Sequence, residues 1–285
     1  MDYFKTACSL LPQAMSRDLL QYTRSEEIRL RLGRQPSFFC GGAEKSFSEA
    51  PVTQKDILHV IEKATGASVH SVITEMRRGY IDYKGLRIGL CGQALIRDGK
   101  FQGFGNYSSL SVRIPHQLQD IGREIIDDIL NSGAESTLII GPPGAGKTTI
   151  LRELIRRVSG SGFRVSVADE RNELSGMYLG EAQFDLGGCT DIITDMKKAE
   201  ASVMLLRGMN PQIIAMDEIT QPEDVEAIFE IAGCGVALFA SAHGRNPSDM
   251  RSRRLYAELF DAGIFRNLIE VFEQDGKRFY SLKRV

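Results

Sequence analysis

Long hydrophobic runs are absent from this sequence of 285 residues. No apolar stretch approaches the ~20 residues that a membrane-spanning helix needs, and the opening MDYFKTACSLLPQAM lacks the basic start and apolar core of a signal peptide. Paired cysteines are also absent, which excludes a disulfide framework or a zinc site, because the five cysteines are scattered and form no CxxC motif. We therefore expect a cytoplasmic protein with no transmembrane segment of its own.

A strong charge of either sign is missing as well, since the formal net charge is −2. Basic residues slightly outnumber acidic ones in residues 1–120, and the reverse holds in the remainder. An excess this small gives no support for DNA binding, and the sequence lacks the interleaved aromatic and basic residues that stack single-stranded bases. We expect no nucleic-acid partner. The length suits two domains of ordinary size.

Residues 1–120 are predicted to form an α+β domain. The strict alternation of Glu27–Leu32 predicts a half-buried strand, and the apolar spacing of Thr53–Thr65 predicts a helix that Thr53 caps. Turn chemistry divides residues 79–114 into a small antiparallel meander, with turns at Lys84-Gly85 and within Arg97–Lys100. Pro115 and the polar residues after it predict a linker near residues 115–122.

Residues 121–285 show a different pattern, in which strands and helices alternate. This alternation predicts an α/β domain with a parallel sheet covered on both faces, whose ligands bind at the carboxyl ends of the strands. The predicted strands are Thr137–Ile140, Arg164–Ala168, Gln212–Met216 and Val236–Ser241. A C-terminal hairpin is predicted around Asp275-Gly276.

A glycine-rich segment lies between the first of these strands and a helical pattern over Thr148–Val158. The backbone N–H groups of such a turn surround a phosphate, because glycines let the chain curl around the anion. Lys147 can then reach the outer phosphates, and the Thr148 hydroxyl can bind Mg²⁺. We predict a nucleoside triphosphate site formed by Gly141, Pro142, Pro143, Gly144, Ala145, Gly146, Lys147, Thr148 and Thr149.

Acidic residues follow two other predicted strands, at the same edge of the sheet. Asp217 suits Mg²⁺ binding, and Glu218 suits the positioning of an attacking water. Glu170 is the alternative water-positioning base, because Asp169-Glu170-Arg171 follows its own strand in the same way. We favour Glu218 because it comes directly after the predicted magnesium ligand.

His243 and several arginines complete the set of candidate residues. His243 ends the next strand and could hydrogen-bond to the γ-phosphate or to the catalytic glutamate. Phosphoryl transfer often uses an arginine from the same or a neighbouring subunit. The candidates for that role are Arg87, Arg113 and Arg207, and Arg171 could touch a phosphate.

The motifs GPPGAGKTTILREL, ADERNEL, TDIITDMKKAEASVMLLRGMNPQIIAMDEI and ASAHG give the chain a family resemblance. It resembles the stage III sporulation protein AA family, which is related to the hexameric type II and type IV secretion ATPases. GYIDYKGLRIGLCGQALI and SSLSVRIP also look like the N-terminal domain of that family. The resemblance implies a RecA-like P-loop ATPase domain over 121–285 and a smaller α+β domain over 1–120.

The resemblance also implies a function. It implies Mg²⁺-dependent ATP hydrolysis, with Glu170, Glu218 and His243 in the active site and with Arg113 or Arg87 near the nucleotide. The implied assembly is a hexameric ring on the cytoplasmic side of a membrane-embedded sporulation complex, in the mother cell. One departure is Asp217, because the secretion ATPases carry glycine before the glutamate. A nucleic-acid-dependent P-loop motor is the alternative function.

Overall fold

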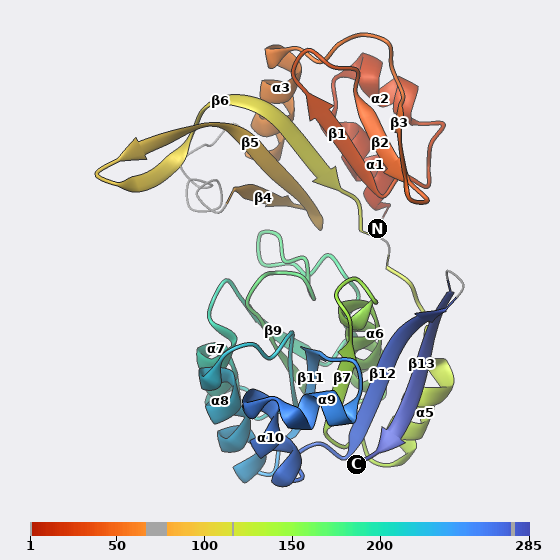
Figure 1. Cartoon of the computed structure of the whole chain (residues 1–285), viewed down its shortest axis with the longest axis vertical. Coiled ribbons are helices and arrows are strands. Elements are labelled where there is room, and N and C mark those ends of the chain that lie inside the picture. Colours follow the sequence, from red (N-terminus) through yellow and green to blue (C-terminus); the bar gives the residue numbers. More distant parts are fainter. Residues whose placement is uncertain (1, 67–78, 116, 275–276) are drawn as a thin grey trace. The chain divides into compact units, whose positions relative to one another are not determined.

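The computed structural model describes residues 2–66, 79–115, 117–274 and 277–285. The chain forms two compact units (Figure 1). The first contains Met1–His116 and Gly176–Gln183, and the second contains Gln117–Ser175 and Phe184–Val285. Each unit has its own sheet, and we describe the two units separately.

The first unit contains a six-stranded antiparallel sheet in the order β3-β2-β1-β6-β5-β4. Its strands are β1 (Glu27–Arg31), β2 (Ser37–Cys40), β3 (Ala43–Ser46), β4 (Tyr80–Tyr83), β5 (Leu86–Arg97) and β6 (Lys100–Arg113). Its helices include α1 (Tyr3–Leu10), α2 (Gln13–Leu19) and α3 (Gln54–Ala64). The predicted α+β character of this part of the chain is confirmed.

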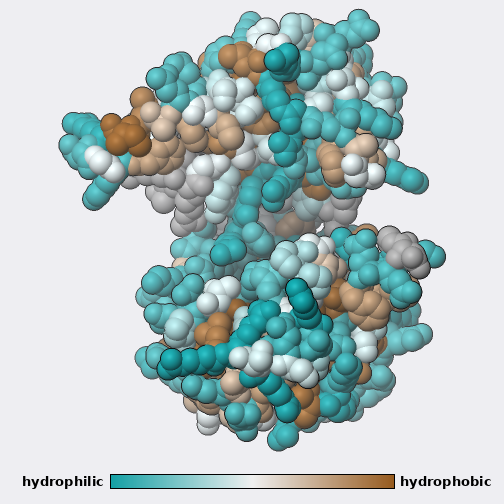
Figure 2. Space-filling view, in the orientation of Figure 1, coloured by the Kyte–Doolittle hydropathy of each residue, from teal (hydrophilic) through white to brown (hydrophobic). Residues whose placement is uncertain are grey.

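The local predictions for the first unit are also confirmed. Ile28 and Leu30 are fully buried, as the alternation in β1 requires. The Thr53 hydroxyl accepts a hydrogen bond from the Asp56 N–H, and the Asp56 carboxylate accepts one from the Thr53 N–H, so α3 begins with a capping box. Leu95 and Ile96 are exposed near the end of β5, and Figure 2 shows brown atoms on the β5–β6 hairpin behind a teal tip.

The second unit contains a seven-stranded sheet in the order β13-β12-β7-β11-β10-β8-β9. Every strand pair is parallel except β12–β13. The strands are β7 (Thr137–Gly141), β8 (Val165–Asp169), β9 (Thr190–Thr194), β10 (Ile213–Met216), β11 (Ala237–His243), β12 (Asn267–Gln274) and β13 (Lys277–Arg284). The helices include α5 (Arg123–Asn131), α6 (Lys147–Gly160), α7 (Lys198–Gly208), α8 (Pro222–Gly233), α9 (Pro247–Ser252) and α10 (Arg254–Asp261).

Helices cover both faces of this sheet, as predicted. Ile139 of β7 packs in a core with residues of α5 and α6, whereas Leu138 and Ile140 pack on the other face with residues of α7, α8 and α10. The four predicted strands and the C-terminal hairpin are confirmed, and the hairpin turn Asp275-Gly276 lies outside the described residues. Strand β9 was not predicted, because all five of its residues are half-buried and show no alternation.

The order of the strands decides which loops meet. Strand β11 lies between β7 and β10, so its carboxyl end separates the glycine-rich loop after β7 from the acidic residues after β10. The register places His243 opposite Gly141 and Ala240 opposite Met216. Residues from three strand ends therefore converge on one edge of the sheet.

We predict that Gly141→Ala destabilises the fold by about 1–3 kcal/mol, because a Cβ at this position would lie 2.7 Å from the Val271 carbonyl oxygen of β12. The matched control is Gly160→Ala, at the end of α6, where a Cβ would meet nothing within 4 Å. Urea unfolding of the two variants measures the difference. Equal stability of the two would contradict the close packing of β7 on β12.

Candidate nucleotide site

The glycine-rich loop connects β7 to α6. Strand β7 ends at Gly141, and α6 begins at Lys147, directly after Gly146. Gly146 has a φ of 101°, which is a left-handed conformation that favours glycine. The first backbone N–H groups of α6 thus open onto the loop, and a helix start of this kind binds anions. The predicted strand, turn and helix order around the phosphate loop is confirmed.

Lys147 is the buried cation of the loop, with 6% of its surface exposed. Its ammonium donates to the Pro142 carbonyl at 3.1 Å and lies 2.8 Å from Nδ1 of His243. Burial lowers the pKa of Lys147, and the negative charges of Glu218 and Asp217 oppose that shift. The ammonium therefore lies across the mouth of the loop.

His243 connects Lys147 to Glu218. Its Nε2 lies 2.6 Å from the Glu218 carboxylate, on the opposite side of the ring from Lys147. An ammonium can only donate hydrogen bonds, so Nδ1 is the acceptor, and the ring hydrogen sits on Nε2 and is donated to Glu218. The structure thus joins three of the predicted site residues in one chain of contacts.

Asp217 lies beside this chain and accepts a hydrogen bond from the Ser241 hydroxyl at 2.9 Å. Ser241 is buried and belongs to β11, two residues before His243. Thr148 is half-buried in the first turn of α6. The hydroxyl that holds Asp217 therefore comes from the same strand that carries the histidine.

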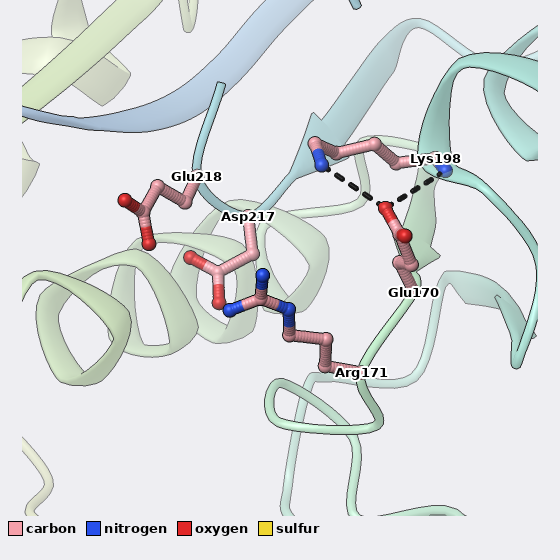
Figure 3. A pocket seen from close by; sticks show the side chains of 5 residues that line it. All are labelled: Glu170, Arg171, Lys198, Asp217 and Glu218. Carbon is pink, nitrogen blue, oxygen red and sulfur yellow. Dashed lines mark hydrogen bonds and ion pairs between the residues drawn. The ribbon is translucent and has the colours of Figure 1, made fainter. Parts of the chain in front are cut away.

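A small pocket opens beside the acidic strand end and is lined by Glu170, Arg171, Lys198, Asp217 and Glu218 (Figure 3). In the figure the Arg171 guanidinium points toward the Asp217 carboxylate, and Glu170 points toward Lys198. Glu218 and Glu170, the two candidates for the water-positioning base, thus line the same pocket but contact different partners. Glu218 contacts His243, whereas Glu170 contacts Lys198.

Lys198 is a site residue that the sequence did not reveal. Its ammonium lies 3.0 Å from the Glu170 carboxylate and 3.4 Å from that of Asp224, and it is nearly buried. Burial raises the pKa of Glu170, but the hydrogen bond and charge of Lys198 outweigh it, so the pKa lies below its ordinary value. A carboxylate whose pKa is lowered is a weaker proton acceptor, so the contact with Lys198 does not favour Glu170 as the general base.

Asp224 and Asp169 are buried carboxylates that hold loops in place. Asp224 accepts from the N–H groups of Thr220 and Gln221 at the start of α8, directly after the acidic strand end. Asp169 is fully buried and accepts from the backbone of Glu173, Leu174 and Ser175. These two residues shape the edge of the sheet, because their oxygens are occupied by the protein's own backbone.

The candidate arginines of the first unit are cross-strand neighbours. Arg87 on β5 lies opposite Arg113 on β6. Arg87 forms an ion pair with Asp82 at 3.2 Å and stacks on the Tyr80 ring. Arg113 pairs with Glu27 at the longer distance of 3.8 Å, and its side chain is 72% exposed. Of the two, Arg113 is the more available to a partner.

Arg207 does not join the candidate site. It lies in the last turn of α7, whereas Lys198 begins that helix, so the helix places them about 14 Å apart along its axis. Its guanidinium is paired with Glu230 of α8 at 3.1 Å. Arg207 therefore does not join the candidate site of its own unit, and an approach to the nucleotide of a neighbouring subunit stays a prediction.

The donor set fits ATP with Mg²⁺. Mg²⁺ is usually bound through one or two carboxylates, waters and substrate phosphates, not through a complete protein cage. Within the described ranges, no group of three or more His, Cys, Asp or Glu residues could hold a metal ion by itself. Thr148 and Asp217 are the residues that would hold Mg²⁺ together with the phosphates.

The second unit has the fold of P-loop secretion and motor ATPases. The ATPase DotB of Legionella pneumophila matches with a TM-score of 0.63 and 16% identity, over 95% of this chain and 80% of that chain. The pilus retraction motor PilT, solved with bound ADP, matches with a TM-score of 0.64 and 16% identity, over 91% of this chain and 79% of that chain. The predicted RecA-like fold with a smaller N-terminal α+β domain is confirmed.

The sequence comparisons identify the family. The profile of the family "Sporulation stage III, protein AA" matches residues 4–279, and the chain belongs to this family. Stage III sporulation protein AA of Bacillus subtilis (strain 168) is 30% identical over 279 residues, which cover 94% of this chain and 90% of that protein. The predicted family is thus confirmed.

No helix among the described residues is both long enough and apolar enough to cross a bilayer.

We predict that Lys198→Met lowers the free energy of unfolding at neutral pH by about 1–3 kcal/mol, because it leaves the Glu170 and Asp224 carboxylates without their cation. The estimate is modest because the Glu170 side chain is 38% exposed. Urea unfolding at several pH values measures the effect, and Lys197→Met, at the exposed neighbouring position, is the control.

The pH dependence of this loss follows from the sign of the Glu170 shift. A carboxyl whose pKa is lowered on folding stabilises the fold above its ordinary value of 4.5 and loses that contribution as the pH falls through the folded value. The difference between wild type and Lys198→Met should therefore shrink below pH 4.5. A difference that stays constant with pH would contradict this assignment.

Proposed function

We propose that the protein is a Mg²⁺-dependent ATPase of the secretion type, which energises a membrane transport or assembly complex during sporulation. One observation carries the proposal: His243 joins the phosphate-loop Lys147 to Glu218 through contacts of 2.8 and 2.6 Å. The stability of the fold does not require that a lysine, a histidine and a glutamate contact one another in series beside a glycine-rich loop. Phosphoryl transfer uses each of them.

Each residue has a role in this proposal. The loop N–H groups and Lys147 hold the phosphates, Thr148 and Asp217 hold Mg²⁺, and Glu218 orients the attacking water. Mg²⁺ would neutralise charge on the phosphates. When the Lys147 ammonium turns toward the phosphates, His243 loses its partner at Nδ1 but keeps Glu218 at Nε2. The hydrogen bonding of His243 to the catalytic glutamate therefore depends on whether the loop holds a nucleotide.

The contacts support Glu218 over Glu170 as the water-positioning group. Glu218 accepts a hydrogen bond from Nε2 of His243, whose other ring nitrogen lies beside Lys147 of the glycine-rich loop. Glu170 is bound to Lys198, which keeps it ionised and fixed in position. We therefore assign Glu170 a positioning role in the acidic loop.

We predict that Glu218→Gln binds ATP normally but hydrolyses it at least ~100-fold more slowly, as expected when a positioned general base is lost. Glu170→Gln should have a smaller effect on hydrolysis, because Glu170 contacts Lys198 and has a positioning role in this proposal, not the role of the general base. Phosphate release under saturating ATP, with affinity measured in parallel, tests both. A full loss in Glu170→Gln with an active Glu218→Gln would exchange the two roles.

We further propose that the active form is a homo-oligomeric ring, a hexamer in the secretion ATPases that the chain resembles, with Arg113 or Arg87 reaching the nucleotide of an adjacent subunit. The 72% exposure of the Arg113 side chain supports this proposal, because its 3.8 Å contact with Glu27 leaves the guanidinium accessible, and Arg87 is its cross-strand neighbour. An arginine from a neighbour would stabilise transition-state charge and make hydrolysis depend on assembly. The proposed location is the cytoplasmic face of a membrane complex in the mother cell.

We predict that mixing Lys147→Ala subunits with Arg87→Ala/Arg113→Ala subunits restores part of the ATPase activity that each lacks alone. A site in the mixed ring can combine an intact Lys147 from one subunit with intact arginines from its neighbour. Phosphate release by the mixture, compared with each variant alone, measures this. Full activity of wild type in a dilute sample shown to be monomeric would contradict the shared site.

A further inference from the structure

The C-terminal strand β13 lies against the beginning of α6. A Cβ on Gly122, directly before α5, would lie 2.6 Å from Ile150 in the first turns of α6 and 3.7 Å from the Tyr280 ring of β13. Tyr280 and Leu282 both pack against the core that α5 and α6 share. The face of β13 that carries Tyr280 and Leu282 is thus turned toward α6.

Arg278 is on this same face, two residues before Tyr280. Its Cδ, Nε and Nη1 atoms each lie 3.4 Å from the position that a Cβ on Gly146 would take. Gly146 is the residue directly before α6, between Ala145 and Lys147 of the phosphate loop. The guanidinium group therefore lies over the last glycine of the loop.

Among the described residues, Arg278 forms no ion pair with a carboxylate. Its cross-strand neighbour on β12 is Glu273, yet in the described part of the chain neither residue takes part in an ion pair or side-chain hydrogen bond. The N-terminus of a helix carries partial positive charge, and Lys147 adds a full charge there. A second cation beside this helix start adds to the attraction of an anion to the loop.

We infer that Arg278 is a nucleotide-binding residue, which contacts the phosphate chain of a nucleotide held in the loop of its own subunit. The inference rests on the proposed nucleotide site and adds to it a part contributed by the C-terminal hairpin. A guanidinium presents a planar fork of donors that matches phosphate oxygens. Because Gly146 has no side chain, no atom of that residue separates the Arg278 guanidinium from a phosphate held in the loop.

The test is a titration of the full-length protein with fluorescent ATP and ADP. Arg278→Ala should bind both nucleotides about 10- to 100-fold more weakly, because a charge-assisted hydrogen bond to phosphate is lost. Arg278→Lys, which keeps the charge but loses the fork, should lie between Arg278→Ala and wild type. Lys277→Ala is the matched control, because Lys277 is the adjacent exposed cation on the same strand.

Two further measurements separate the outcomes. Thermal unfolding without nucleotide should be the same for Arg278→Ala and Lys277→Ala, and with nucleotide only Arg278→Ala should lose stabilisation. Mixing Lys147→Ala with Arg278→Ala subunits should restore no activity, because both groups belong to one chain.

Affinity of Arg278→Ala equal to that of Lys277→Ala, in a wild type that binds ATP, would overturn the assignment of Arg278 alone. Restored activity in the mixture would overturn its action within one subunit. A wild type that binds neither nucleotide would overturn the proposed function as well.

Discussion

His243 stands between a cation and a carboxylate, and the strand order puts it there. Because β11 runs between β7 and β10, its last residue separates the phosphate loop from the acidic strand end. The imidazole closes that gap with one contact on each side, to Lys147 and to Glu218. Ser241 of the same strand orients Asp217. Under the proposed function, a change at the phosphates would reach Glu218 through this single ring, without a long chain of side chains.

The acidic residues at this edge divide by what occupies their oxygens. Asp169 and Asp224 accept backbone hydrogen bonds and so fix the loops that follow β8 and β10. Glu170 is tied to Lys198, which also contacts Asp224, so these three residues join two loops. Asp217 and Glu218 contact Ser241 and His243 of β11, and under the proposed function a nucleotide would alter these contacts. The carboxylates at this edge therefore divide into those that hold loops in place and those that the proposed reaction uses.

The sequence predicted the elements better than the partners. Strands β7, β8, β10 and β11 are apolar runs bounded by turn residues, so their positions could be predicted, and Thr53 matched its capping role. Strand β9 could not be predicted, because a half-buried edge strand has no periodic pattern. Lys198 and Arg278 were missed because their roles depend on contacts across 28 and more than 100 residues of sequence, and no local pattern distinguishes them from surface cations. Arg207 is close to a motif in sequence, but α7 carries it away from the candidate site of its own unit.

The most direct test of this account is the ¹⁵N NMR signal of the His243 ring in the full-length protein, assigned by comparison with His243→Asn. Spectra are recorded without nucleotide and with a slowly hydrolysed ATP analogue and Mg²⁺. The account predicts a ring that carries hydrogen on Nε2 in both states, with an Nδ1 signal that moves when the analogue draws Lys147 away. Identical Nδ1 signals in both states, in a sample shown to bind the analogue, would contradict it.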